Sequence, residues 1–161
     1  MVNITDGGSW EVDEIIDASL VGLWQFGMYR PDDPKIASTM QAILEQLWVK
    51  TSVGGIARYI NDHYHQVSQD ISNVPGNPWF ICTLWLAEWY ALTAKRADDL
   101  KQALDILEWV AVHALPSGIL AEQLDPYNEQ PVSVSPLTWS HAAYVNAVLT
   151  YLQSKKQLKA S

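Results

Sequence analysis

Cysteine is nearly absent from this sequence: Cys82 is the single thiol and lies in an apolar stretch. No disulfide can therefore form within the chain. Basic residues are also scarce, with 10 Lys and Arg against 18 Asp and Glu and a net charge of −8. This acidity argues against binding to nucleic acid or to an anionic membrane surface. The first residues lack the basic and apolar regions of an export signal, which makes the cytoplasm the simplest expected location.

Long apolar runs are missing too. The longest, from Trp79 to Ala94, is interrupted by Thr83 and Glu88 and falls short of the roughly 20 residues that span a bilayer. Phenylalanine is rare, with 2 residues, whereas the chain has 8 Trp and 7 Tyr. Two interpretations of this balance are open: tryptophans that pack helices together, or aromatic rings that serve as platforms for the apolar faces of sugars.

What is present is a strong helical pattern in a chain of 161 residues. This length is enough for one domain, 1–161, which would bury roughly 70% of its unfolded surface. Residues 1–8 are expected to form an open arm, and 54–76 a long loop without a period. The apolar spacing and the capping residues predict five helices, at 9–27, 34–53, 77–94, 98–114 and 135–156.

Two of these helices are expected to be enclosed by others. The third helix is apolar on every side and the fifth around most of its circumference, whereas the second and fourth have one apolar stripe. This alternation of inner and outer helices along the chain predicts an all-α fold of the α/α-barrel type. A plain helical bundle is the alternative.

The segment from Pro116 to Trp139 is long for a connection between helices, and loops of this length are usually functional or disordered. Ser135-Pro136 is expected to cap the fifth helix. Glu122 lies between apolar or neutral neighbours and could act as a general base on water, although a loop glutamate is more often a solvated surface residue.

Metal ligands are poorly represented. His63 and His65 have the right chemistry, yet the pattern around them supplies no Cys or further His at ligand spacing. We therefore expect neither a metal site nor a cofactor.

Several motifs together resemble the C-terminal part of glycoside hydrolase family 15, which includes glucoamylases, glucodextranases and some trehalases. They are Val12 to Leu20, Gly55-Ile-Ala-Arg-Tyr59, the run from Gly76-Asn-Pro-Trp79 to Tyr90, Gly118 to Pro126, and Val134 to Ala142. The resemblance implies an (α/α)6 barrel of twelve helices, of which this chain would be the C-terminal half. It also implies hydrolysis of α-glucosidic bonds with inversion, which uses two carboxyl groups about 6.5–9.5 Å apart.

The same resemblance assigns roles to four residues. Glu122 matches the general base, and Arg58 matches an arginine that holds sugar hydroxyls. Trp79 matches a ring lining the sugar subsites and Trp139 a tryptophan bordering the pocket, with a packing role as the alternative for both. We expect Glu122 to face an enclosed saccharide cavity, with Arg58 and the indole rings nearby.

One part of the family pattern is missing from the sequence. The general acid of the family lies in a motif of the type Asp-Leu-Trp-Glu-Glu, and no such string occurs here. The chain alone is therefore expected to have little or no activity, and to self-associate or to pair with a complementary N-terminal half. The alternatives are a noncatalytic carbohydrate-binding or scaffold remnant of the same fold, or a helical interaction module unrelated to sugars.

Overall fold

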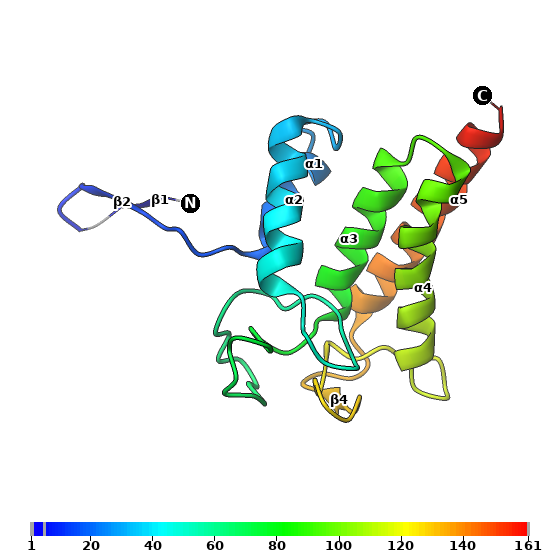
Figure 1. The fold of residues 1–161 in the computed structure, drawn as a ribbon. Helices are drawn as coiled ribbons and strands as arrows, with labels where there is room; N and C mark the ends of the chain where they lie inside the picture. Colours follow the sequence, from blue (N-terminus) through cyan, green and yellow to red (C-terminus); the bar gives the residue numbers. More distant parts are fainter. Residues whose placement is uncertain (1, 5, 161) are drawn as a thin grey trace.

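A computed structural model describes residues 2–4 and 6–160, and in this part of the chain the protein is mostly helical (Figure 1). Five α-helices are accompanied by two 3-10 helices and two short antiparallel ladders in these residues. In order, the elements are β1 Val2–Ile4, β2 Trp10–Val12, η1 Ala18–Val21, α1 Gly22–Gln25, α2 Pro34–Leu47, α3 Phe80–Thr93, η2 Ala97–Leu100, α4 Lys101–His113, β3 Gln123–Leu124, β4 Pro131–Val132 and α5 Thr138–Ala160.

The predicted helix at 9–27 is wrong over its first half. In the arm predicted at 1–8, residues 2–4 form strand β1, and residues 1 and 5 lie outside the described residues. Strand β1 pairs with β2, and Figure 1 shows this hairpin set apart from the helices. The Asp13 carboxylate accepts a hydrogen bond from the amide of Ile15 at 2.9 Å, a local bond that competes with a helix. Helical structure begins only at Ala18, where the Asp17 side chain caps the amide of Ser19 at 2.7 Å.

Helix α2 begins where the sequence predicts. The Asp33 carboxylate accepts a hydrogen bond from the amide of Lys35 at 2.8 Å, and Pro34 occupies the first turn. Its predicted apolar stripe is buried, as Ile36, Met40, Ile43 and Leu47 show. The helix ends at Leu47, before its predicted end at 53, because the chain then turns back on itself, with Val49 N–H donating to the Gly55 carbonyl at 2.9 Å.

Helix α3 is the enclosed helix that its composition predicts. Nine of its 14 residues are buried, and it contacts both α4 and α5. In Figure 1 it lies between α2 and the α4–α5 pair. Even the polar residues of α3 are enclosed: Glu88 is 5% exposed and accepts a hydrogen bond from Asn146 on α5 at 2.8 Å.

The start of the fourth helix differs slightly from the prediction. Asp98 and Asp99 do not precede the helical region but lie inside η2. The Asp99 carboxylate instead reaches back to the amides of Lys95 and Arg96, at 3.0 and 2.9 Å. It satisfies donors at a helix start as a capping residue does.

The fifth helix departs from prediction in its start and in its burial. It begins at Thr138, because residues before it run alongside the segment around Leu120: Leu137 N–H donates to the Leu120 carbonyl at 3.0 Å. Ser135 is therefore not its cap. Its predicted enclosure is also wrong for this chain, since only one face is buried. Val145, Leu149 and Leu152 are 58, 51 and 52% exposed, so α3 is enclosed and α5 is not.

The two long loops meet at one end of the helices. As predicted, 54–76 has no regular helix or strand, and its backbone makes isolated bridges, including Ala57 with Pro78. The loop after α4 forms a bridge of its own to the start of α3, between Trp79 and Gln123. We call the contact between these two loops and the start of α3 the seam. It contains most of the candidate site residues.

Candidate active site

The seam is held by backbone hydrogen bonds on both sides of the start of α3. Trp79 N–H donates to the Ile56 carbonyl at 2.9 Å, and Phe80 N–H donates to the Glu122 carbonyl at 3.3 Å. Buried Asn77 ties the loops together through its side-chain amide, which donates to the His65 carbonyl and to Gln123 Oε1, both at 2.8 Å. A buried amide satisfied in this way fixes the relative position of the segments that it joins.

Glu122 is half-buried on this seam, and its backbone and side chain are both fixed. Its N–H donates to the Val134 carbonyl at 2.9 Å, and Ser133 Oγ donates a short hydrogen bond to Glu122 Oε2. The β3–β4 ladder, which pairs Gln123 with Val132, places Ser133 beside Glu122. Ser133 has a φ of 65°, a left-handed conformation that is uncommon for serine and is found more often at functional sites.

Tyr64 extends this network. Its hydroxyl lies 3.3 Å from Ser133 Oγ, and since the single serine proton is donated to Glu122, the tyrosine is the donor in this pair. The Tyr64 ring lies 6.1 Å from the ring of Trp79. Neither Ser133 nor Tyr64 was singled out from the sequence. The only sequence signal for these two residues is their position in segments predicted to be loops.

Arg58 lies against the same rings. Its guanidinium donates two hydrogen bonds to the Asp62 carboxylate, at 2.8 and 2.7 Å, and the Asp62 side chain is only 2% exposed. The hydrogen bonds to Asp62 raise the pKa of Arg58 despite partial burial. The Arg58 guanidinium carbon lies 4.7 Å from the ring centre of Trp79 and 5.5 Å from that of Tyr64, within cation–π range.

The two tryptophans assigned to sugar binding have different surroundings. Trp79 is 4% exposed, and its indole N–H has no partner among the described residues. Its ring lies next to the Arg58 guanidinium and the Tyr64 ring. Trp139 is 55% exposed and makes an edge-on contact with Trp85 of α3, with ring centres 6.0 Å apart. Arg58, Trp79 and Glu122 thus belong to one connected cluster through Tyr64 and Ser133, whereas Trp139 lies on Trp85.

The histidines considered as metal ligands have other contacts. His63 Nδ1 lies 3.0 Å from Gln66 Oε1, and the His65 ring lies edge-on to Tyr64 at 4.5 Å. Among residues 2–4 and 6–160, the structure has no group of three or more His, Cys, Asp or Glu placed to hold a metal ion. Nor does any helix in these residues have both the length and the apolar character to cross a membrane.

The described chain is mostly helical, and its five α-helices align with part of the (α/α)6 toroid of solved structures. The chain belongs to glycosyl hydrolases family 15, whose sequence profile matches residues 3–108 and 98–149. An uncharacterised glycosyl hydrolase of Methanocaldococcus jannaschii is 33% identical over 144 residues, covering 83% of this chain and 22% of that protein. A trehalase of Mycobacterium tuberculosis is 28% identical over 149 residues, covering 92% of this chain and 20% of that enzyme.

The structural relatives agree with the sequence. A crystal structure of a bacterial glucoamylase complexed with acarbose superposes with a TM-score of 0.74 and 28% identity, covering 96% of this chain and 23% of that enzyme. The chain therefore spans about a fifth of the length of the curated relatives described above, at 22% and 20%. The membership in family 15 and the fold class inferred from the motifs are confirmed.

Proposed function

We propose that this chain supplies the general-base side of an inverting α-glucosidase of the glucoamylase type, with Glu122 as the base. The observation that carries the proposal is the fixed position of the Glu122 carboxylate, held by Ser133 in one cluster with Arg58. Its described side-chain hydrogen bonds are both made to Oε2. Oε1 is the oxygen that would orient a water molecule and accept its proton during attack on the sugar.

Arg58 is proposed to hold the hydroxyls of the sugar. Its pairing with buried Asp62 fixes the guanidinium while leaving 34% of the Arg58 side chain exposed. A charged donor fixed before the substrate arrives loses little freedom on binding. The substrate class is α-glucosides: α-1,4-glucans, isomalto-oligosaccharides and trehalose all fit a family that includes a glucoamylase and a trehalase.

The general acid is proposed to come from a complementary N-terminal half, because the sequence holds no Asp-Leu-Trp-Glu-Glu type motif. The exposed apolar residues of α5, with Phe26 at 88% exposure, are surfaces that such a half would cover. The enclosed saccharide cavity predicted around Glu122 would then be completed on assembly.

The decisive experiment mixes this chain with the N-terminal part of the catalytic domain of the Methanocaldococcus jannaschii relative and measures glucose release from maltose and trehalose. We expect hydrolysis only in the mixture, and a loss of roughly 10²–10⁴ in rate with Glu122→Gln, since general-base catalysis is worth about that much. Glu129→Gln is the matched control, because Glu129 is exposed in the same loop.

Two outcomes would contradict the proposal. Hydrolysis by the mixture that is unchanged by Glu122→Gln would exclude Glu122 as the base. Binding of maltose without hydrolysis in any mixture would favour the noncatalytic carbohydrate-binding or scaffold alternative.

A further inference from the structure

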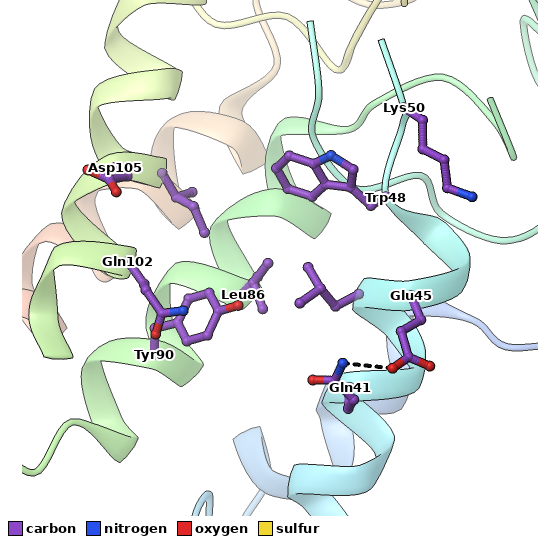
Figure 2. Close-up of a pocket in the computed structure, with 10 residues that line it drawn as sticks. Gln41, Glu45, Trp48, Lys50, Leu86, Tyr90, Gln102 and Asp105 are labelled. Carbon is purple, nitrogen blue, oxygen red and sulfur yellow. Dashed lines mark hydrogen bonds between the residues drawn. The ribbon is translucent and has the colours of Figure 1, made fainter. Parts of the chain in front are cut away.

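A second concave site lies on the opposite side of α3 from α5, between α2 and α4. It is an open groove with a volume of about 530 Å³, and Glu122 is not part of its lining. Figure 2 shows the side chains of α2 and α4 facing each other across this groove, with α3 behind them. Cavities that bind small molecules usually measure about 300–1,000 Å³.

The sequence builds this groove from residues one helical turn apart. Spacings of three, four and seven residues place side chains on one face of a helix. Helix α2 contributes Gln41, Leu44 and Glu45, and the segment just after it contributes Trp48 and Lys50; α3 contributes Leu86 and Tyr90; α4 contributes Gln102, Asp105 and Ile106. The groove is therefore formed mainly by three helical faces, and the segment after α2 adds Trp48 and Lys50 at one end.

The apolar part of the groove has two aromatic rings. Trp48 is half-buried, and its orientation is fixed because Gly54, at a φ of 70°, packs against it so closely that a Cβ there would lie 3.0 Å from the indole ring. Tyr90 lies against Trp89, with ring centres 5.3 Å apart, and its hydroxyl lies at the groove (Figure 2). Burial raises the pKa of Tyr90, which keeps this hydroxyl protonated.

Polar groups lie on both walls above this apolar floor. On α2, the Gln41 amide donates to Glu45 Oε1 at 2.8 Å, a contact drawn in Figure 2. On α4, Asp105 is held by Lys101 at 2.6 and 2.8 Å, and Gln102 also lines the groove. Amides and carboxylates offer both donors and acceptors in a plane, which matches neighbouring hydroxyls.

We propose that this groove binds a glucosyl segment of an α-glucan, as a noncatalytic site separate from Glu122. A pyranose ring has apolar C–H faces for Trp48 and a rim of hydroxyls for the amides and carboxylates. Lys50, which also lines the groove, and Lys101, which pairs with Asp105, offset the charges of Glu45 and Asp105, so the groove has no strong charge of one sign to select an ionic ligand. The polar rim disfavours a purely apolar molecule. The chemistry of the groove indicates a neutral polyol, whereas the choice of an α-glucan rests on the proposed function.

The test is calorimetric titration of the 161-residue chain with maltohexaose. We expect binding, and a rise in Kd of about tenfold or more in the double variant Tyr90→Phe/Gln102→Ala, which removes two hydrogen-bonding groups. Gln153→Ala, an exposed glutamine on α5, is the matched control and should leave Kd unchanged. Equal melting temperatures by circular dichroism would show that the double variant folds normally.

The active-site variant Glu122→Gln separates this proposal from the proposed function. It should leave binding in the groove unchanged even though it abolishes hydrolysis by the assembled enzyme. Absence of binding at millimolar maltohexaose, binding that the double variant does not weaken, or equal or tighter binding of cellohexaose would each overturn the assignment of an α-glucan site.

Discussion

Ser133 connects Glu122, the proposed general base, to the aromatic ring of Tyr64. It donates to Glu122 and lies within hydrogen-bond distance of Tyr64. Because Tyr64 and Ser133 are 69 positions apart in the chain, no local spacing in the sequence could predict their contact. Arg58, Trp79 and Glu122 were named through the family resemblance, whereas these two connecting residues became visible only in three dimensions.

Substitution of Ser133 by alanine should lower kcat of the assembled enzyme about tenfold or more with little change in KM. The hydrogen bond to the carboxylate is charge-assisted and worth about 1.5–3 kcal/mol, and its loss frees the base from its fixed orientation. Steady-state kinetics on maltose would check this. Ser117→Ala, an exposed serine in the same loop, should have no effect, and an equal loss from both variants would contradict the proposed role.

Burial of Glu88 on α3 affects stability in a pH-dependent way. Desolvation raises the pKa of this carboxyl, and the hydrogen bond from Asn146 only partly opposes the rise. A raised folded-state pKa means that ionised Glu88 destabilises the fold above the unfolded value near about 4.3. Glu88→Gln should therefore raise the free energy of unfolding at pH 7, and the gain should vanish below pH about 4.

Urea denaturation of wild type and Glu88→Gln at pH 7 and at pH 3.5 would measure this. The amide can still accept the hydrogen bond from Asn146, so the comparison isolates the charge. A gain that persists at the lower pH would show that the effect has another cause.

Among the elements, those with a capped start or a strong apolar pattern were predicted best. Helix α2 has Asp33 and Pro34 at its start, and α3 is apolar all round. The failures have a common physical reason, namely that backbone or side-chain partners outside the pattern compete with helix formation. Asp13 bonds its neighbouring backbone before η1, and Leu137 bonds Leu120 before α5.

The cap of α2 can be tested directly. Asp33→Ala should lower the free energy of unfolding by about 1 kcal/mol, the usual value of an N-cap carboxylate. Asp32→Ala is the matched control: Asp32 is the next residue, and its pair with exposed Arg30 should contribute little. Urea denaturation of both variants would decide, and equal losses would contradict a capping role.

For the whole molecule, the exposed face of α5 is the main departure from a self-contained fold. Val145 and Leu149 are one turn apart and more than half exposed, at 58 and 51%. Composition correctly predicts that α5 is an apolar helix. Whether α5 is enclosed depends on neighbouring helices, which the sequence of α5 itself does not specify. Contiguous apolar surface of this kind favours association.

We therefore expect the chain to self-associate at micromolar concentration and Leu149→Glu to shift it toward the monomer, because a charge would have to be buried in the contact. Gln153→Glu, which adds the same charge to an already polar exposed position of α5, is the control. Sedimentation velocity would measure both. A wild-type chain that sediments as a single monomeric species would contradict the expectation.

The bonds that fix Glu122 come from Ser133, Val134 and Phe80, all in this chain. The contacts that position the proposed base therefore all lie within this one chain. If this chain were combined with different N-terminal halves that carry the general acid, linkage preference would change with the partner, whereas the residues that activate water would stay the same. The boundary between the two halves would then be a natural point of exchange in evolution and in enzyme engineering.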